Sequence, residues 1–383
     1  MKSALPLTGI RVIELCWVWS GPLLGQMLAD LGAEVIKVEW FKRYDLYRTR
    51  GVERQSGAHP EAIRREMSQS FHNINRNKIG VTLDLKRPAH RDALIELART
   101  TDIVIENFTA GTLERLGIGY DRLSKANPAI VLLSLAAFGS TSKLGEMRAY
   151  GLGLSSLSGL ESIVTDPLNG DFMGSPTFVA SDPNAATYGL PIAIASVLDA
   201  RRTGKGAHVE VSQLEAAAHV GADDADLANT AKALGMQSVL RPDMASIIKT
   251  GDGQFLCVDW VGRVSEQTLE RLRESAKTLP AVTALEVIRG AGAKAVKVIE
   301  QPSEFGAGAA QDDTLLNSIH PVTGPEEIVA APWRMDGQRA PIRKPAPTLG
   351  EGNAYVFGKL LGWKHADYSS LAQEELEHTR AKT

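Results

Sequence analysis

Asp182 stands at the start of a long apolar run that is typical of a helix. A carboxylate in such a place could attack a thioester, provided that the thioester carbonyl is polarised and water is excluded. The plainer interpretation is a helix N-cap, because an aspartate oxygen accepts the free N–H groups of a first helical turn. Pro183 fits a first helical position and supports the cap. Residue types alone therefore favour the cap over the nucleophile.

Basic residues supply a second kind of chemistry, the binding of anions. Lys42, Arg43 and Arg48 follow an apolar run that ends at Glu39. If that run is a strand of an open parallel sheet, these residues lie at its carboxyl edge, where ligands of such folds bind. Guanidinium and ammonium groups suit phosphates well. For any one of these residues, a solvated surface charge is the alternative.

The segment from Gly21 to Gly25 raises the alternative of a dinucleotide enzyme. It reads G-P-L-L-G, and Glu39 stands about 20 residues further on, where an acid that binds ribose would be expected. A dinucleotide fingerprint needs a middle glycine, and here Pro22 and Leu23 would obstruct the approach of a pyrophosphate. The two glycines are therefore expected to serve a tight turn and close packing, and no NAD site is predicted.

The composition is ordinary for a soluble globular protein: 383 residues, 44% hydrophobic and 23% charged. A net charge of -3 provides no broad basic field for nucleic acid. Cys16 and Cys257 offer neither a disulfide framework nor zinc spacing and suit a reducing cytosol. The N-terminus lacks the features of a signal peptide, and no apolar run approaches the roughly 18 residues of a membrane span. We therefore expect a cytoplasmic protein of two or three domains without a metal, nucleic-acid or membrane partner.

Strands and helices are expected to alternate through the first half of the chain, and such alternation predicts a doubly wound parallel sheet. Ser20 to Pro22 is predicted to be a turn. A hairpin near 249–259 and an amphipathic helix at 265–275 indicate a second, smaller α+β domain. The expected strands of the first half are 10–15, 33–39, 80–85, 102–106, 130–135 and 208–211, and the expected helices are 23–31 and 89–99.

Three further stretches carry no clear chemistry. Asp223, Asp224 and Asp226 could bind a cation, but a solvated helix face is the favoured interpretation. The polar stretch Gln55–Gln69 is expected to be a surface excursion, and Gly306–Ala310 a loop of small residues.

Several blocks of sequence, in a consistent order, resemble those of a known family. The chain is similar to the family III (CaiB/BaiF-type) CoA-transferases, which include formyl-CoA transferase and carnitine CoA-transferase. The blocks are SGPLLGQMLADLGAEVIKVE from Ser20, NRNKIGVTLDLK from Asn75, DIVIENFTAGTLERLGIGY from Asp102, RRTGKG from Arg201 with the following VEVSQLEA, and PAPTLGE from Pro345.

The resemblance implies an α/β architecture with a large Rossmann-like domain in residues 1–220. It implies a linker and small α+β domain in residues 221–335, and a segment, 336–383, that returns to the large domain. It also implies a homodimer with interlocked subunits; a heteromer with a related subunit is the alternative.

The resemblance further implies that Asp182 is a covalent nucleophile. Attack on an acyl-CoA donor would give an aspartyl anhydride and then an aspartyl-CoA thioester, from which a carboxylic acid acceptor receives CoA. The energy of the thioester is conserved, so neither ATP nor a metal is required. Coenzyme A contacts are expected from Arg76, Lys78, Asn107, Phe108, Arg115 and Arg148, together with Lys42 and Arg48, and substrate-pocket contacts from Val18, Trp19 and Tyr150.

The chain departs from the family pattern at three places, and two other functions stay open. Ile79 replaces an arginine of the family, Trp19 replaces the glutamine of formyl-CoA transferase, and Pro183 follows the expected nucleophile. Ile79 and Pro183 leave room for a non-catalytic subunit of a heteromeric transferase, and Trp19 suggests a different acyl group. Racemases of the same superfamily pair the aspartate with a histidine, but Tyr150 occupies the matching position, so the second base is missing.

Overall fold

The computed structural model describes residues 5–52, 59–163, 180–220, 246–259, 265–298, 313–366 and 368–369. These residues divide into two compact units. Unit 2 contains the described residues between 246 and 313, and unit 1 contains all the others. Three segments on which the sequence made predictions, the cluster Asp223 to Asp226, the loop Gly306–Ala310 and the beginning of Gln55–Gln69, lie outside the described residues.

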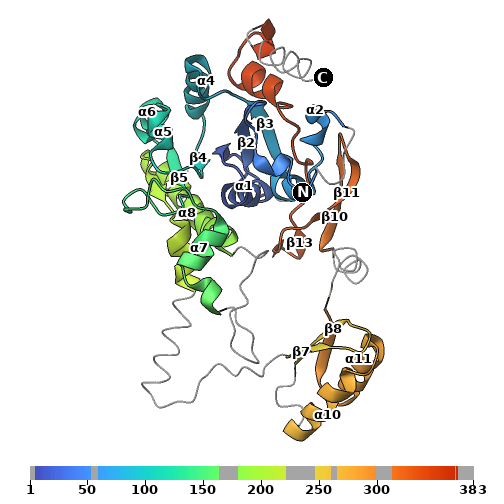
Figure 1. The fold of residues 1–383 in the computed structure, drawn as a ribbon. Coiled ribbons are helices and arrows are strands. Elements are labelled where there is room, and N and C mark those ends of the chain that lie inside the picture. Colours follow the sequence, from blue (N-terminus) through green and yellow to red (C-terminus); the bar gives the residue numbers. More distant parts are fainter. Residues whose placement is uncertain are drawn as a thin grey trace. The chain divides into compact units, whose positions relative to one another are not determined.

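Unit 1 is built on a six-stranded sheet whose neighbouring strands are all parallel. The strand order is β3-β2-β1-β4-β5-β6, so the chain changes direction across the sheet between β1 and β4. Ligands of such sheets bind outside the carboxyl ends of the strands at this switch point. The predicted doubly wound sheet is confirmed (Figure 1). The strands are β1 (Arg11–Leu15), β2 (Glu34–Glu39), β3 (Lys78–Thr82), β4 (Ile103–Glu106), β5 (Val131–Ser134) and β6 (His208–Glu210).

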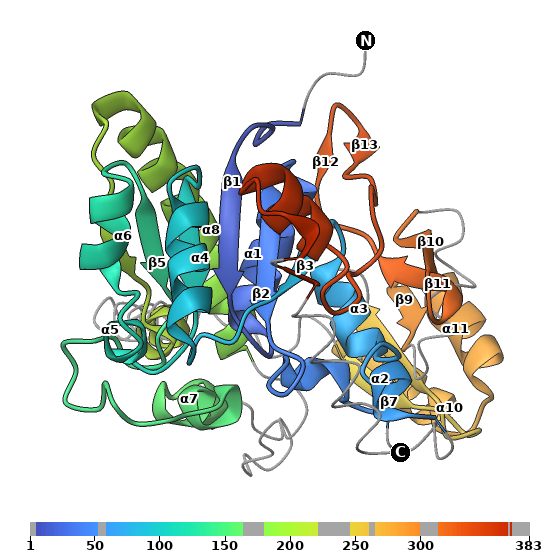
Figure 2. The ribbon, with the colours of Figure 1, turned by 90° about the horizontal axis from the view of Figure 1, so that it is seen from above.

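Helices cover both faces of this sheet (Figure 2). Successive strand residues point to opposite faces, so Val12 joins the core beneath one helical layer and Ile13 joins the core beneath the other. Both cores are closed to solvent. The first layer consists of α1 (Ser20–Asp30) and α8 (Ser181–Thr203), and the second contains α4 (Pro88–Ala98) and α6 (Tyr120–Ala126).

Helix α1 begins at Ser20, earlier than the predicted start at Leu23, so the predicted turn at Ser20 to Pro22 is wrong. Proline is tolerated in a first helical turn because its missing N–H would have no intrahelical partner there. Pro22 therefore continues the helix instead of preceding it. As a consequence, the backbone N–H of Ser20 lies at the open N-terminal end of α1.

The glycines of α1 serve close packing, as the sequence predicted. A Cβ atom on Gly21 would lie 2.3 Å from Cys16 Sγ, and one on Gly25 would lie 1.9 Å from Glu14 Oε2. No side chain fits at either distance, so α1 approaches β1 only because both positions are glycine.

The chain returns to unit 1 through the hairpin of β10 (Leu315–His320) and β11 (Gly324–Val329). The sequence placed this hairpin in the small domain, which was expected to end at residue 335. The correct boundary lies before Thr314, because the hairpin packs on α3 (Gln69–Asn75) and Val329 O accepts a 2.7 Å hydrogen bond from Arg76. The following short pair is β12 (Arg334–Met335) and β13 (Gln338–Arg339).

The C-terminal segment then extends along the edge strand β3. Gly352 N–H donates to Gly80 O at 2.8 Å, and Thr82 N–H donates to Asn353 Oδ1 at 2.9 Å. The π-helical segment Ala354–Leu360 follows and adds Val356 and Phe357 to the core of unit 1.

Two buried histidines stack where the hairpin meets α3. The rings of His72 and His320 are 4.0 Å apart, and His72 Nδ1 lies 2.7 Å from Glu326 Oε2. His320 Nδ1 accepts from the backbone N–H groups of Val322 and Thr323, so in the neutral ring the proton is on Nε2. Burial, assisted by His72, lowers the pKa of His320 to about 4.

We predict that this histidine pair makes unit 1 sensitive to mild acid. Because the pKa of His320 is about 4 when folded and 6.5 when unfolded, the unfolded chain binds an extra proton between these values. The free energy of unfolding should therefore fall as the pH falls through that window, at up to about 1.4 kcal/mol per pH unit for this group. Chemical denaturation of His320→Asn should show a shallower pH dependence than wild type. The exposed His365→Asn is the control, and equal slopes for all three proteins would contradict the prediction.

Unit 2 is a small α+β unit, as expected from the sequence. Its three-stranded antiparallel sheet has the order β7-β8-β9, and the turn between β7 and β8 matches the predicted hairpin. Leu256 and Val258 face the helices and are fully buried. The elements are β7 (Ser246–Lys249), β8 (Phe255–Asp259), α10 (Glu266–Ala276), α11 (Ala281–Gly290) and β9 (Lys294–Lys297). None of the helices in the described part of the chain has the length and hydropathy to cross a membrane.

Candidate functional site

The loop between β1 and α1 lies at the switch point of the sheet and is held by side chains from two other segments. Asn107, directly after β4, accepts from Trp17 N–H at 2.9 Å and donates to Trp17 O at 2.8 Å. Asp45 Oδ1 accepts from Val18 N–H at 2.9 Å. Val18 has a φ of 71°, which is rare for a β-branched residue and strained. The loop conformation therefore depends on these bonds.

A buried ion network lies beneath this loop. Lys37 Nζ contacts Glu14 Oε1 at 2.9 Å and Asp45 Oδ2 at 3.0 Å, and it also donates to Cys16 O at 2.8 Å. Burial alone would lower the pKa of Lys37, but the surrounding carboxylates raise it. Lys37 is therefore charged, and it orients Asp45 toward the Val18 N–H.

Lys78 belongs to the same network and does not reach a ligand surface, contrary to the sequence prediction. Its ammonium group is fully buried and contacts Glu14 Oε2 at 2.8 Å, Asn75 Oδ1 at 2.8 Å and Pro22 O at 2.7 Å. Burial lowers the pKa of Lys78 to about 8. The predicted coenzyme A contact is wrong because all three donor positions of this ammonium group bind protein atoms.

Arg48 is also buried instead of exposed to a ligand. It contacts Glu39 at 2.8 Å and Glu66 at 2.7 Å, and both of these side chains are buried. Arg48 and the other partners of Glu39 lower the pKa of Glu39 to about 2 against the effect of burial. Glu66 comes from the stretch Gln55–Gln69, so the described end of that stretch is not the predicted surface excursion.

Arg76 is the third predicted phosphate contact that the fold uses internally. Its guanidinium group binds Asp30 Oδ2 at 2.7 Å at the end of α1, and the residue is only 4% exposed. Together with its bond to Val329 O, this contact joins α1 to the returning hairpin. Arg48, Lys78 and Arg76 therefore support the site from behind and do not line it.

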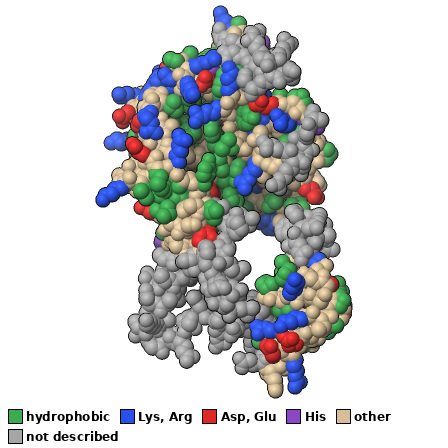
Figure 3. Space-filling model, viewed as in Figure 1, with side chains coloured by type: hydrophobic (Ala, Val, Ile, Leu, Met, Phe, Trp, Pro, Cys, Tyr) green, Lys and Arg blue, Asp and Glu red, His purple; other side chains and the backbone are tan. Residues whose placement is uncertain are grey.

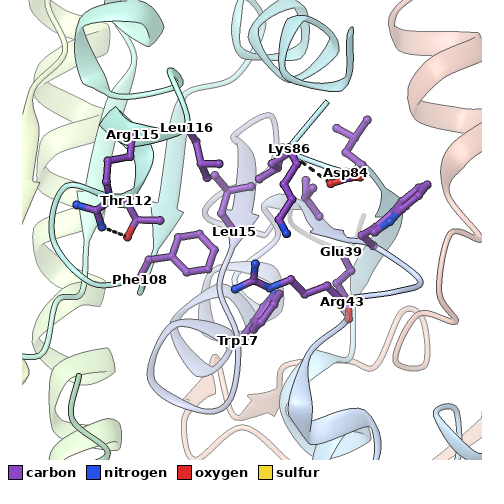
Figure 4. Close-up of a pocket in the computed structure, with 14 residues that line it drawn as sticks. Leu15, Trp17, Glu39, Arg43, Asp84, Lys86, Phe108, Thr112, Arg115 and Leu116 are labelled. Carbon is purple, nitrogen blue, oxygen red and sulfur yellow. Dashed lines mark hydrogen bonds between the residues drawn. The ribbon is translucent and has the colours of Figure 1, made fainter. Parts of the chain in front are cut away.

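Two adjoining pockets open at the carboxyl ends of β1, β2 and β4. The first, which we call the edge pocket, has a volume of about 250 Å³ and is mostly apolar. Arg43 lies with its guanidinium carbon 5.3 Å from the ring centre of Trp17, and the Trp17 and Phe108 rings meet edge to face at 6.1 Å. Figure 4 shows Lys86 pointing into the space between Phe108 and Arg43. The other lining residues include Leu15, Val38, Leu83, Leu85, Thr112, Arg115 and Leu116.

The second pocket, which we call the Asp182 pocket, has a volume of about 500 Å³. The two pockets share five lining residues: Trp17, Arg43, Phe108, Thr112 and Arg115. They are therefore parts of one continuous surface. The Asp182 pocket adds Val18, Ser20, Leu46, Asn107, Thr109, Ala137, Gly145, Met147, Arg148, Ala149, Tyr150, Gly151, Asp182 and Gln213.

Asp182 lies half-buried in the first turn of α8 and faces the N-terminus of α1. The N-cap of α8 is Ala180, which makes no side-chain capping bond, so the predicted capping role of Asp182 is wrong. Ser20, the first residue of α1, lines the same pocket and is the neighbour that most lowers the pKa of this carboxyl, through its backbone N–H and its hydroxyl. Burial raises the pKa of Asp182, whereas Ser20 and the Arg50 guanidinium lower it. Asp182 is thus influenced by a neighbouring helix and does not cap its own.

The pocket brings together most of the remaining residues that the sequence proposed. Asp182, Asn107, Phe108, Arg115, Arg148, Val18 and Tyr150 all line it, with Arg148 and Tyr150 exposed. Trp19 does not line either pocket but packs on the cluster that contains Tyr47 and Phe71. Lys42 is exposed, lies over the Phe41 ring at 5.4 Å, and lines neither pocket.

The sequence analysis missed several lining residues. Three of them lie close to the ends of expected strands or helices at the carboxyl edge of the sheet: Trp17, Ser20 and Gln213. Their position at this edge could have identified them as candidates for ligand binding. Lys86 carries the same signal, because it directly follows the expected strand 80–85. Thr112 does not, because it lies several residues beyond the end of the expected strand 102–106. Figure 3 shows hydrophobic side chains exposed in the middle of unit 1 with Lys and Arg side chains around them.

Within the described residues, no three His, Cys, Asp or Glu side chains are grouped so that they could hold a metal ion. The expectation of a metal-free protein stays a prediction.

Comparisons with known proteins agree on one family. The family model described as CoA-transferase family III matches residues 7–271. A succinate–glutarate CoA-transferase of Agrobacterium fabrum is 36% identical over 210 residues, which cover 55% of this chain and 51% of that protein. The succinyl-CoA:glutarate CoA-transferase of Mus musculus is 27% identical over 401 residues, which cover 96% of this chain and 89% of that protein. The chain thus aligns with about half the length of the bacterial relative and with most of the mouse relative.

The solved structures show the same fold. A CaiB/BaiF family protein from Brucella suis superposes with a TM-score of 0.76 at 23% sequence identity, over 94% of this chain and 100% of that chain. At this identity the likeness concerns the fold alone.

Proposed function

This chain belongs to CoA-transferase family III, and from that premise we propose that it moves CoA from an acyl-CoA thioester to a carboxylic acid, with Asp182 as the nucleophile. The observation that carries the proposal is the half-buried Asp182 carboxylate at one end of a continuous pocket surface that has guanidinium groups along it and an apolar, aromatic slot at the other end.

The two pockets fit the parts of a CoA thioester, which is a substrate here. A flat base suits the edge pocket, since Trp17 and Phe108 offer ring faces and edges. Phosphates suit the exposed guanidinium groups of Arg43 and Arg115, which line both pockets, and that of Arg148, which lines the Asp182 pocket. The thioester would then bind in the Asp182 pocket. There the acyl group would contact the apolar and aromatic side chains of Met147, Tyr150 and Leu46.

The proposed chemistry needs no group beyond the carboxylate and hydrogen-bond donors. An Asp182 oxygen attacks the thioester carbonyl, the C–S bond breaks, and CoA thiolate leaves an acyl-aspartyl anhydride. The thiolate attacks the Cγ atom of Asp182 and releases the donor acid, which leaves an aspartyl-CoA thioester. The acceptor carboxylate and the thiolate then repeat these steps in reverse order and regenerate the free carboxylate. Hydrogen-bond donors at the developing oxyanion accelerate every such attack.

A racemase would need a second base opposite the aspartate. None of the described residues that line the Asp182 pocket is a histidine, and Tyr150 is the N-cap of α7 (Gly151–Leu157). These observations support the transferase over the racemase. Homodimeric assembly, a heteromer with a related subunit and a cytoplasmic location stay predictions from the family resemblance.

The proposed function is tested by a screen of acyl-CoA donors against carboxylic acid acceptors, read by mass spectrometry of the acyl-CoA products. Succinyl-CoA and glutarate are the first pair to try, because the mouse relative carries that name. Transfer by the purified chain alone supports the proposal. The non-catalytic alternative gains support if transfer appears only when a second, related subunit is added.

We predict that Arg43→Gln weakens CoA binding more than it slows transfer. A charge-assisted hydrogen bond to a phosphate contributes about 1.5 kcal/mol or more, which corresponds to about tenfold in affinity. The dissociation constant of CoA should rise by about that factor at low salt and depend less on salt than in wild type. Arg202→Gln, which removes an exposed arginine at the other end of α8, is the matched control. An unchanged dissociation constant would remove Arg43 from the site.

A further inference from the structure

The Ser20 hydroxyl is fully buried at the floor of the Asp182 pocket and lies among three polar side chains. Ser20 Oγ lies 3.2 Å from Asn107 Nδ2 and 3.3 Å from Gln213 Nε2, and it lines the same pocket as the Asp182 carboxylate, whose pKa it lowers. The three partners come from the ends of β4 and β6 and from the start of α8, so four segments of unit 1 converge on this one oxygen.

The orientation of both amides follows from their backbone contacts. A carbonyl oxygen only accepts, so the atom of Gln213 that lies 3.0 Å from Leu135 O is its nitrogen. In the same way, the atom of Asn107 that lies 2.8 Å from Trp17 O is its nitrogen. Each NH₂ group therefore has one N–H on a backbone carbonyl and one N–H left for Ser20 Oγ.

The direction of the Ser20 proton follows from this arrangement. A hydroxyl has one proton and two acceptor lone pairs, and here the two amides occupy both lone pairs. The proton is therefore directed at the remaining neighbour, the Asp182 carboxylate. Together with its own backbone N–H, Ser20 offers two donors to Asp182 from the N-terminal end of α1, where the helix dipole also favours negative charge.

We propose that the Ser20 hydroxyl, held by Asn107 and Gln213, is an oxyanion donor for the steps in which Asp182 itself is attacked. The inference rests on the proposed function, because it concerns the covalent states of Asp182. In these steps the thiolate or the acceptor carboxylate adds to Cγ, and the electron pair of the C=O bond moves onto the Asp182 oxygen. The oxygen returns the pair when the C–O or C–S bond to the leaving group breaks, and no proton is transferred.

The proposed role of Ser20 accelerates some steps of the reaction and not others. The first attack, by Asp182 on the donor thioester, places the new negative charge on the oxygen of the acyl group and not on Asp182. Ser20, which lowers the pKa of Asp182, then favours the charged attacking carboxylate and gives no advantage to this step. The second step, attack of the thiolate on Cγ, gains from Ser20, because a neutral carbonyl oxygen becomes an oxyanion.

The test compares wild type, Ser20→Ala and Thr101→Val, all as the full chain. Thr101 is the matched control, because its buried hydroxyl donates to Leu97 O at 2.9 Å and lines neither pocket. Rapid mixing of each protein with succinyl-CoA measures the release of donor acid in a single turnover. For Ser20→Ala we expect release to be slower by about 100-fold, the usual effect of one lost oxyanion donor. CoA binding should be unchanged, because the variant alters no cationic contact.

A second readout separates this role from a merely structural one. Ser20 lowers the pKa of Asp182, so in Ser20→Ala the acid limb of kcat/KM should move to higher pH. A general loosening of the fold would lower the rate at every pH without moving that limb. Thermal unfolding measures the fold directly, and Ser20→Cys, which keeps the volume but has only a weak donor, carries the test if Ser20→Ala does not fold.

The outcomes separate the inference from the proposed function. If wild type forms a hydroxamate at Asp182 when acyl-CoA and hydroxylamine are present, the nucleophile stands and the inference can be judged on its own. Ser20 variants that release the donor acid as fast as Thr101→Val, or whose acid limb stays in place, would overturn the inference. If wild type forms no adduct and transfers no CoA with any pair in the screen, the proposed function fails and the inference fails with it.

Discussion

Replacing Asp182 with asparagine should reduce CoA transfer on the order of 10⁴-fold or more, the scale seen when a covalent nucleophile is removed. Asparagine has nearly the same volume and keeps an oxygen that can accept hydrogen bonds, so the fold and the pocket should persist. Only the nucleophilic charge is lost. Steady-state transfer measures the effect, and CoA binding and thermal unfolding should match wild type.

Covalent trapping locates the nucleophile independently of the rate. Acyl-CoA with hydroxylamine should convert Asp182 of the wild-type protein to a hydroxamate, which peptide mapping detects, and it should leave Asp182→Asn unmodified. Near-native transfer by the variant, or an adduct on another carboxylate, would show that the mechanism proposed here is wrong.

Replacing Lys37 with methionine should lower the free energy of unfolding by about 3–5 kcal/mol, because it leaves buried carboxylates without their cation. Lys37 is fully buried and contacts both Glu14 and Asp45. Lys78 still compensates Glu14 in the variant, whereas Asp45 loses its ion pair. Because Asp45 also holds the strained Val18, CoA transfer should fall as well. Urea denaturation followed by tryptophan fluorescence measures the change in stability.

Two further variants make this result interpretable. Arg202→Met removes the cation of an exposed ion pair with Asp199, and such pairs contribute about 0–1 kcal/mol. Adding Asp45→Asn to Lys37→Met removes the uncompensated charge and should recover part of the stability. A loss for Lys37→Met no larger than for Arg202→Met would mean that the buried network contributes little to the fold.

The arrangement of the sheet could be predicted from the sequence because its signals are local. The central residues of the expected strands, 103–105 and 130–133, are apolar without a break, as is typical of strands buried on both faces, and helices separate these strands. Once the sheet is known to be doubly wound, its carboxyl edge is the expected ligand site. Asn107 and Phe108, which the family resemblance named, fit this rule because they lie directly after a strand, and both line the Asp182 pocket.

The sequence could not show which basic residues face the pocket and which are buried in ion pairs. Arg48 and Arg43 are the same residue type, five positions apart in the chain, and both follow β2. Arg48 is buried because Glu39, Glu66 and the carbonyl of Pro347 surround it, and Pro347 is 299 residues away in the sequence. The charge of a side chain is a property of its residue type, whereas its burial depends on which distant segments pack around it.

The same reason explains why residue types alone favoured a capping role for Asp182, which the structure does not show. A helix start predicts a cap, since capping is a contact between neighbours in the chain. The residue that most lowers the pKa of its carboxyl is Ser20, on another helix, and Ser20 is in turn oriented by residues at the ends of β4 and β6. Asp182 faces a pocket and not its own first turn because α1 and α8 pack side by side on one face of the sheet, with their N-termini together at its carboxyl edge.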